Sequence, residues 1–269
     1  MSELSEIIEL CNKSGLFKTV DYNKYNDLLM IHSSSVMEGS TLTLHETEML
    51  ITENITPEGR PLEHSLMIKD HYKALMEVHQ MAKSESLFFT HEMIKNIGAL
   101  VMHGTGDMVN TALGTYDKSK GDYRLNNVRS TGGHYYINYD KVQAGVNNLI
   151  TTVNESINKV STTEDVFTLG AYTHLEFLTV HPFGDGNGRT ARLLNNLILL
   201  HKGLPLIVID AAKKGKYIEA IKKSREQNTL NAFSDFLKKE YVTFWKRELN
   251  VFKNKTASKD IGLSFSLTF

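Results

Sequence analysis

The chain has 269 residues, 41% of them hydrophobic, and a formal net charge of −1 at pH 7. This balance provides no global field for nucleic acid or anionic lipid, so we expect neither partner and look for a local site. The single cysteine, Cys11, excludes an internal disulfide framework and is compatible with a reducing compartment. No apolar run approaches about 18 residues and the acidic N-terminus lacks a signal-peptide pattern, so we expect a cytoplasmic protein.

Apolar residues recur at helical spacing along most of the chain, which contains only four prolines. The pattern predicts an all-α, mainly helical fold with one β-hairpin, in a single domain over residues 1–255. Helices are expected at residues 1–17, 21–39, 64–82, 90–101, 142–160, 166–178, 191–200 and 233–245. The tail, residues 256–269, ends in alternating apolar residues. It is either a disordered end or a strand that adds to another subunit of a homo-oligomer.

The second expected helix, residues 21–39, ends in a carboxylate. Asp21 is a suitable N-cap, and apolar positions recur at three- and four-residue intervals up to Gly39. Glu38 then lies at the helix C-terminus, where the macrodipole already places partial negative charge. The position is electrostatically unfavourable, so we expect a cationic partner for Glu38. The alternative is a solvated glutamate at a helix end.

Residues 122–137 have the pattern of a β-hairpin. Alternating residues lead to a turn at Gly132 and Gly133, and an aromatic return strand follows up to Ile137. The preceding residues, 102–121, show no clear period and are expected to form a loop. The hairpin is either a plain structural ribbon or an open strand edge on which an extended segment of another protein can pair.

The most informative stretch is residues 181–192, which combine a base, a carboxylate, three glycines and two arginines. The glycine-rich run precedes an apolar helix, so its backbone N–H groups predict an anion-binding nest suited to phosphate. A carboxylate beside such a nest, Asp185, indicates Mg²⁺ shared with the phosphate oxygens. Arg189 and Arg192 are three residues apart and can both reach the nest. His181 can take up a proton near neutral pH.

These twelve residues match the Fic family signature His-x-Phe-x-Asp/Glu-Gly-Asn-Gly-Arg-x-x-Arg at every defined position, so the chain resembles a Fic-domain protein adenylyltransferase. The segment from Ser34 to Gly39 also fits the inhibitory motif Ser/Thr-x-x-x-Glu-Gly/Asn, placed as in the subclass with an N-terminal inhibitory helix. Gly121-Asp-Tyr123-Arg124 is similar to the entry of the family's flap hairpin. The resemblance covers roughly residues 22–245.

The resemblance implies transfer of AMP from ATP to a hydroxyl side chain of a target protein, with release of pyrophosphate. His181 would be the catalytic base and Asp185 the ligand of Mg²⁺. The target would be either an unidentified protein or the chain itself. The nucleotide would be held by the backbone amides of the nest, by the Asn187 side chain, by the two arginines, and by an aromatic residue at the adenine. These residues are Gly186, Asn187, Gly188, Arg189, Arg192 and Tyr217. Ser224 stands where the family often has asparagine.

The resemblance further implies that Glu38, with Ser34, blocks the nucleotide by pairing with Arg192. The flap would bind the target through Val128, Arg129, Ser130 and Thr131. Two other activities fit the same residues. The site can remove AMP, with Glu38 orienting a water, or it can use another nucleotide or a phosphocholine carrier as donor. A nucleotide-binding regulator without catalysis is the non-enzyme alternative, and the intact His181 argues against it. His174, one helix segment earlier, is expected to be a core histidine without a metal role.

Overall fold

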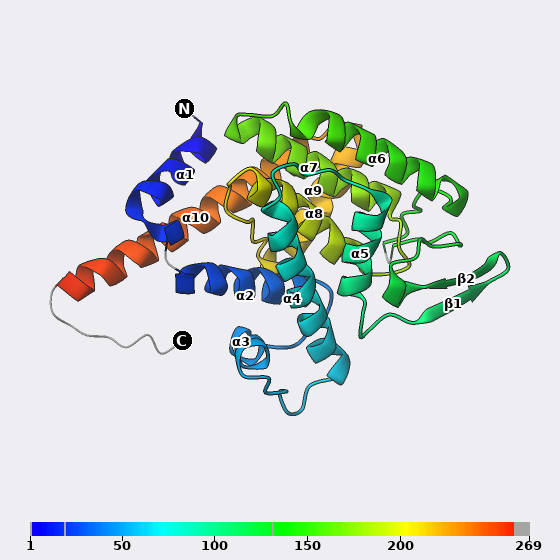
Figure 1. Ribbon diagram of the computed structural model, residues 1–269, viewed down its shortest axis with the longest axis horizontal. Coiled ribbons are helices and arrows are strands. Elements are labelled where there is room, and N and C mark those ends of the chain that lie inside the picture. Colours follow the sequence, from blue (N-terminus) through cyan, green and yellow to red (C-terminus); the bar gives the residue numbers. More distant parts are fainter. Residues whose placement is uncertain (1, 19, 131, 261–269) are drawn as a thin grey trace.

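The computed structural model describes residues 2–18, 20–130 and 132–260 (Figure 1). Ten α-helices span this part of the chain, which confirms the mainly helical prediction. They are α1 Glu3–Ser14, α2 Val20–Met37, α3 Leu44–Thr52, α4 Leu62–Ala82, α5 His91–Val101, α6 Val142–Ile157, α7 Thr163–Val180, α8 Asn187–His201, α9 Lys214–Glu226 and α10 Asn231–Asp260. No helix among the described residues is long and apolar enough to cross a membrane.

Helix α8 lies at the centre of the fold, surrounded by the other helices (Figure 1). Its leucines and isoleucines point to all sides, and Leu193, Leu194, Leu197 and Ile198 are each 0% exposed. A helix that is apolar around its whole circumference must be covered on every side. Helices α7 and α4 provide most of this cover, and α5 and α2 contact the first half of α8. The N-terminus of α8 therefore has a fixed position on a rigid core.

Helix α2 packs along α4, and its last residues reach α8. It begins at Val20, one residue before the expected start, and ends at Met37. Gly39 then adopts a φ of +104°, a left-handed conformation that glycine accepts without steric cost. This turn stops the helix directly after Glu38, so the glutamate is held at the helix end.

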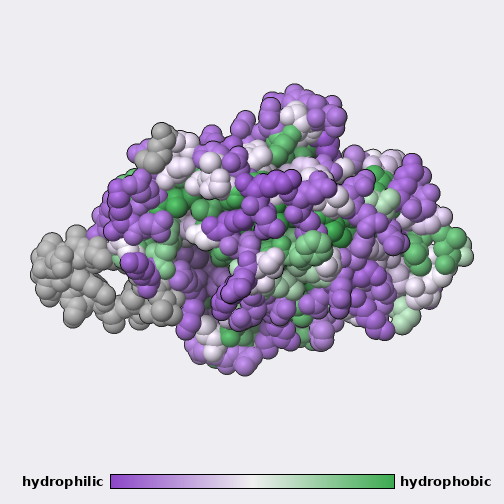
Figure 2. Space-filling model, turned by 45° about the horizontal axis from the view of Figure 1, so that its top comes forward, coloured by the Kyte–Doolittle hydropathy of each residue, from purple (hydrophilic) through white to green (hydrophobic). Residues whose placement is uncertain are grey.

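The two β-strands do not lie where the hairpin was predicted. They are β1 Met108–Thr111 and β2 Gly114–Asp117, an antiparallel pair within the segment expected to be a loop. The prediction failed because only Tyr116 is buried in the pair, so the residues show no alternating pattern. The hairpin projects from the body, and its side chains Met108 and Leu113 are 62% and 58% exposed. Figure 2 shows apolar surface at the right edge of the molecule, the side to which β1 and β2 project in Figure 1.

The segment expected to form the flap hairpin, residues 122–137, is a turn with few ladder bonds. The amide of Ser130 donates to the carbonyl of His134 at 2.9 Å, and that of Tyr136 donates to the carbonyl of Val128 at 3.3 Å. An isolated bridge joins Arg129 to Tyr135. The prediction of two regular strands here was wrong. The entry residues pair elsewhere, because Tyr123 forms a bridge with Phe183 and the amide of Arg124 donates to the carbonyl of Pro182 at 2.9 Å.

The C-terminal helix is longer than predicted. Helix α10 continues through Asp260, so residues 256–260 are helical and do not form a separate tail. The alternating residues Leu263 to Phe269 lie outside the described part of the chain.

Candidate active site

His181 follows the last residue of α7 and has left-handed backbone angles, φ 51° and ψ 60°. Such a conformation is unfavourable for a residue with a Cβ, and it persists where neighbouring contacts hold it. The amide of His181 donates to the carbonyl of Phe177 at 2.9 Å, and its carbonyl accepts from Arg124 Nε at 2.8 Å. The imidazole is stacked on the ring of Tyr136, with centroids 3.7 Å apart. The His181 imidazole is thus fixed in place by both the end of α7 and the flap.

Arg124 is the residue that joins the flap to this corner. Its guanidinium is buried and donates to the carbonyls of His181, Val180, Asn126 and Ile137, at 2.6–3.4 Å. These carbonyls come from the end of α7 and from both ends of the flap. Burial lowers the pKa of the Arg124 guanidinium. The sequence indicated Arg124 only as part of the flap-entry segment. Its bridging role was missed because every residue has a backbone carbonyl, so no residue type marks the acceptors.

Burial of the His181 imidazole, together with the positive charges of Arg124 and Arg225, lowers its pKa to about 3. The ring is therefore neutral at pH 7, which is the form that can accept a proton. Negative charge brought close to an imidazole raises its pKa, so a bound polyphosphate would strengthen this base.

The loop after His181 is anchored by Phe183 and Asn187. The Phe183 ring packs against Gly98 of α5, where a Cβ would lie only 2.5 Å from the ring. The Asn187 side chain accepts from the amide of Phe183 at 3.0 Å and donates to its carbonyl at 2.9 Å. The expectation that this side chain holds an anion is therefore corrected, because both ends of the amide close the loop. Its backbone N–H remains in the first turn of α8, next to those of Gly186 and Gly188.

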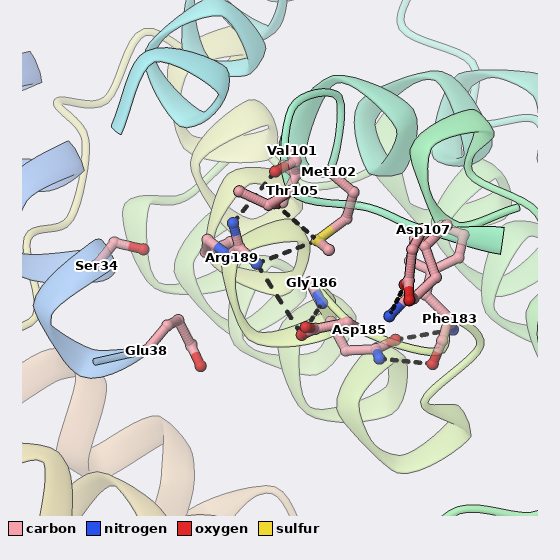
Figure 3. Close-up of polar contacts among 12 residues, drawn as sticks. Ser34, Glu38, Val101, Met102, Thr105, Asp107, Phe183, Asp185, Gly186 and Arg189 are labelled. Atoms are coloured by element: carbon pink, nitrogen blue, oxygen red, sulfur yellow. Dashed lines mark hydrogen bonds and ion pairs between the residues drawn. The ribbon is translucent and has the colours of Figure 1, made fainter. Parts of the chain in front are cut away.

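The Glu38 carboxylate lies on the first turn of α8. A Cβ added to Gly188 would collide with Glu38 Oε1 and would lie 3.2 Å from an Nη of Arg192. Figure 3 shows Ser34 and Glu38 projecting from the end of α2 toward this turn. Gly188 is thus the residue that lets a carboxylate approach the helix N-terminus, where negative charge is favourable.

Arg192 binds the end of α2 through three hydrogen bonds. Its Nε donates to Ser34 Oγ at 2.6 Å, and one Nη donates to Ser34 O at 3.2 Å and to Glu38 Oε1 at 2.5 Å. Burial favours the neutral form of Glu38, but Arg192, and less strongly Arg189, outweigh it, so the pKa of Glu38 lies below its usual range. The pair is ionised at neutral pH, and Glu38 has the cationic partner that its helix-end position demanded.

Arg189 is equally buried, at 2% exposed, but faces a different neighbour. It donates to the carbonyl of Val101 at 3.2 Å and to the sulfur of Met102 at 3.1 Å, at the end of α5 (Figure 3). Its guanidinium is 4.0 Å from Asp185 Oδ1. Burial lowers the pKa of Arg189, against the opposing effect of Glu38 and Asp185.

Asp185 is 62% exposed and precedes the nest. Its Oδ1 accepts from the amide of Gly186 at 2.5 Å. Among the described residues there is no group of three or more His, Cys, Asp or Glu side chains that could surround a metal. One exposed carboxylate beside an anion nest suits Mg²⁺, which often takes one or two protein carboxylates and completes its shell with phosphate oxygens and water.

Tyr217, expected at the adenine, is a core residue of α9 that is 5% exposed. Its hydroxyl bonds His174 Nε2 at 2.8 Å, and its ring packs against Phe233 and Phe236. Burial raises the pKa of Tyr217 to about 12, and the Arg192 charge opposes this effect. The Tyr217 hydroxyl thus also lies close to the Arg192 guanidinium. His174 is a fully buried core histidine, as predicted.

A cavity of about 370 Å³ lies next to Tyr136, the residue whose ring stacks on His181, and is bounded by the flap, α7 and the junction of α9 with α10. Its lining includes Tyr136, Ile137, Glu176, Thr179, Ser224 and Arg225. Arg225 Nε donates to Thr179 Oγ1 at 3.0 Å, and the guanidinium lies 5.6 Å from the Tyr136 ring. Tyr136 is therefore sandwiched between the base and a cation. Neither Tyr136 nor Arg225 belongs to a sequence motif, so sequence reasoning missed both.

The described flap residues expected to bind a target are not among those that line this cavity. Arg129 is exposed, and Val128 and Ser130 are partly exposed. Thr131 lies outside the described residues. Two of these residues already form backbone hydrogen bonds within the flap. The amide of Ser130 donates to the carbonyl of His134, and the carbonyl of Val128 accepts from the amide of Tyr136.

Comparison with known proteins agrees with this geometry. Residues 88–199 match the family model described as Fic/DOC family. The Protein adenylyltransferase Fic of Drosophila persimilis is 29% identical over 204 residues, which are 73% of this chain and 36% of that protein. The chain thus spans about a third of the length of the curated relatives it matches.

Two solved structures share the fold over 94% of this chain. A Fic domain containing signaling protein from Bacteroides thetaiotaomicron superposes with a TM-score of 0.78 at 22% identity, over 97% of its own chain. Fic-1 from C. elegans, residues 134–508, superposes with a TM-score of 0.76 at 19% identity, over 72% of its own chain. Residues 88–199, the part that matches the Fic/DOC family model, contain the His181 loop and the N-terminus of α8.

Proposed function

We propose that this protein is an adenylyltransferase that moves AMP from ATP to a hydroxyl side chain of Ser, Thr or Tyr in a protein. The observation that carries the proposal is the juxtaposition of a neutral imidazole, His181, with an anion nest at the start of α8 and two buried arginines. The name of the Drosophila relative, Protein adenylyltransferase Fic, supports the same activity.

In the proposed reaction, the neutral His181 ring accepts the proton of the target hydroxyl. The hydroxyl oxygen attacks the α-phosphorus, and the bond from that phosphorus to the pyrophosphate breaks on the opposite side. The amides of Gly186, Asn187 and Gly188 stabilise the phosphate oxygens, and Arg192 neutralises the leaving end once it is free of Glu38. These contributions are positioning and charge stabilisation, as for phosphoryl transfers in general.

Asp185 would hold Mg²⁺ against the phosphates, and the metal when bound would neutralise charge on their oxygens. We expect Asp185→Asn to abolish the gain in ATP affinity that Mg²⁺ confers on the wild type. The change keeps the size and polarity of the side chain and removes its charge. Calorimetry with and without Mg²⁺ measures this gain, and an equal gain in both proteins would refute the metal role of Asp185.

The nucleoside would enter the cavity next to Tyr136, which reaches Ser224 and Arg225. This assignment replaces direct contact with Tyr217, whose ring is buried in this structure. Tyr217 would then act on the nucleotide through Arg192. On the other side of the base, an extended target segment would pair with the edge of the flap through Val128, Arg129 and Ser130.

We also propose that Glu38 represses the enzyme. The ion pair leaves Arg192 committed to Ser34 and Glu38, and the carboxylate occupies the place on Gly188 where a phosphate would bind. ATP would then bind with its α-phosphate turned away from the incoming hydroxyl.

Removal of AMP from a modified protein is the second candidate, because the ionised Glu38 carboxylate lies at the phosphate nest and is placed to orient a water. A chase of labelled protein distinguishes the two. Loss of label from the wild type, but not from a Glu38→Gln variant, would favour removal.

Incubation with ATP labelled at either the α- or the γ-phosphate tests the main proposal. We expect the protein fraction to retain the α-label and not the γ-label, most strongly in a Glu38→Gly variant. Retention of the γ-label would indicate phosphorylation instead. No labelling of the chain or of any added protein, in a folded Glu38→Gly variant that binds ATP, would favour the regulator without catalysis.

A further inference from the structure

The hairpin formed by β1 and β2 has no part in the function proposed above, yet its base lies against the loop that follows His181. A Cβ added to Gly184, the residue before Asp185, would lie 2.8 Å from the Tyr116 hydroxyl oxygen and 3.2 Å from Lys118 Cδ. Both side chains come from the segment where β2 ends. The hairpin thus places a lysine stem on the loop that carries the proposed base and metal ligand.

The backbone from which this lysine projects is firmly held. It begins the short 3₁₀ helix Lys118–Lys120, which packs against α5. A Cβ added to Gly121, the next residue, would collide with the carbonyl of Lys95 in α5. The amide of Lys118 donates to the carbonyl of Asp107 at 3.1 Å. The lysine stem therefore starts from a fixed position.

The ammonium group of Lys118 forms an ion pair with Asp107, the residue before β1. The Lys118 side chain is 19% exposed, whereas that of Asp107 is 72% exposed. A surface lysine usually extends its charged end into water, but here the cation is the covered partner and the loop at Gly184 is part of its cover. Ion pairs with an exposed partner are weak, so a more highly charged anion can replace the Asp107 carboxylate.

Two ion pairs thus lie at opposite ends of the stretch from Gly184 to Gly188. The Glu38 carboxylate, bound to its arginine, contacts Gly188, and the Lys118 stem contacts Gly184. Figure 3 shows Glu38 on one side of this stretch and Asp107 on the other. A polyphosphate lying along the stretch would meet a cation at each end, and each cation is paired with a carboxylate in this structure.

We propose that Lys118 binds a phosphate oxygen of the nucleotide and exchanges its bond to Asp107 for a bond to this ligand. The inference rests on the proposed function, because it requires a polyphosphate at the start of α8. Lysine suits the role, since its ammonium group binds phosphate as a point charge on a flexible stem. The hairpin is then part of the nucleotide site, and Asp107 competes with the nucleotide for the lysine.

Calorimetry of the full chain with ATP and Mg²⁺ tests the role of the lysine. We expect Lys118→Met to weaken ATP binding about tenfold, because it removes the charge and keeps an apolar stem of similar length. Lys120→Met is the matched control. It removes the same charge from the same turn, but at a side chain that is 73% exposed and paired with Asp117, so ATP affinity should not change. An equal loss in both variants would overturn the proposal.

Asp107→Asn tests the exchange of partners. It breaks the same ion pair from the other side and frees the lysine, so ATP should bind more tightly, by up to about fivefold for an exposed pair. If the pair only tied β1 to the turn after β2, Lys118→Met and Asp107→Asn would change ATP affinity in the same direction or leave it unchanged. Either of these results would refute the proposal.

Adenosine, which has no phosphate, is the ligand control. We expect its affinity to be the same in the wild type, Lys118→Met and Asp107→Asn. A loss of adenosine binding in Lys118→Met would show that the lysine supports the shape of the site and would overturn its role at the phosphate. If the wild type and Lys118→Met bind ATP equally well, this inference alone fails. If the wild type does not bind ATP, the proposed function fails and the inference fails with it.

Discussion

The two sides of the candidate site are built differently. The α8 side is rigid: Arg189 and Arg192 are 2% and 4% exposed, and each is held by contacts with a neighbouring helix. The flap side is held at its base by one buried arginine, Arg124, and beyond it by a few backbone bonds around an open turn. The α8 side is thus preformed, with a carboxylate already on its first turn, whereas the described part of the flap side is held by few internal bonds.

A finer contrast separates the two arginines within the rigid side. They lie three residues apart on one helix, yet Arg192 binds the carboxylate of α2 and Arg189 binds the end of α5. Only Arg192 is directly bonded by Glu38 among the described residues. Repression would therefore act through one arginine, while the other keeps its place in both states.

The largest effect is expected from the residue that both sides share. His181→Ala should reduce AMP transfer by roughly 10²–10⁴-fold, because it removes the base that accepts the hydroxyl proton. Nucleotide binding should survive, since the imidazole is not expected to hold phosphate. Labelling with α-labelled ATP measures the first and calorimetry the second. Undiminished labelling would end the catalytic assignment.

Breaking the block on the rigid side should raise activity. Glu38→Gly frees Arg192 and uncovers Gly188, so labelling should increase about tenfold or more, which corresponds to roughly 1.4 kcal/mol and is on the scale of a charge-assisted pair. The double variant Glu38→Gly, His181→Ala should be silent. Equal labelling by wild type and a folded, ATP-binding Glu38→Gly variant would show that the pair does not repress.

The buried base also makes a prediction for stability against pH. The pKa of His181 is lowered to about 3 in the folded protein, so between about pH 6.5 and pH 3 the unfolded chain binds the extra proton. The contribution of the neutral ring to the free energy of unfolding is thus fully present above about pH 6.5 and decreases as the pH falls. In urea unfolding between about pH 7 and pH 5, His181→Asn should flatten this decline by up to about 1.4 kcal/mol per pH unit. His45→Asn, at an exposed position, is the control, and an equal decline in wild type and His181→Asn would contradict the neutral buried ring.

The smallest effect is expected on the open side. Val128→Pro removes one amide from the flap edge, and a single backbone hydrogen bond contributes about 1 kcal/mol, or roughly a fivefold change. Target labelling should fall by about this factor while ATP affinity stays close to that of the wild type. Retained labelling would place the target elsewhere than on the flap.

The sequence alone predicted the helical class, the central burial of α8 and the anion nest. These features follow from local rules, because hydrophobic period, glycine conformation and helix start are set within a few neighbouring residues. The pairing of Glu38 with Arg192 was anticipated from a helix-end carboxylate together with the family resemblance. Neither the local rules nor the family resemblance predicted where the strands lie. Strands β1 and β2 are in the expected loop, and the expected hairpin is an open turn.

Tertiary structure alone decided which groups meet across the site. Arg124 binds carbonyls from three segments, Tyr136 stacks on His181, and Tyr217 is buried near Arg192 and not at an open surface. Such contacts depend on how α2, α7, α8 and the flap pack against one another. That packing minimises exposed apolar surface over the whole chain, and no local pattern of residues encodes it.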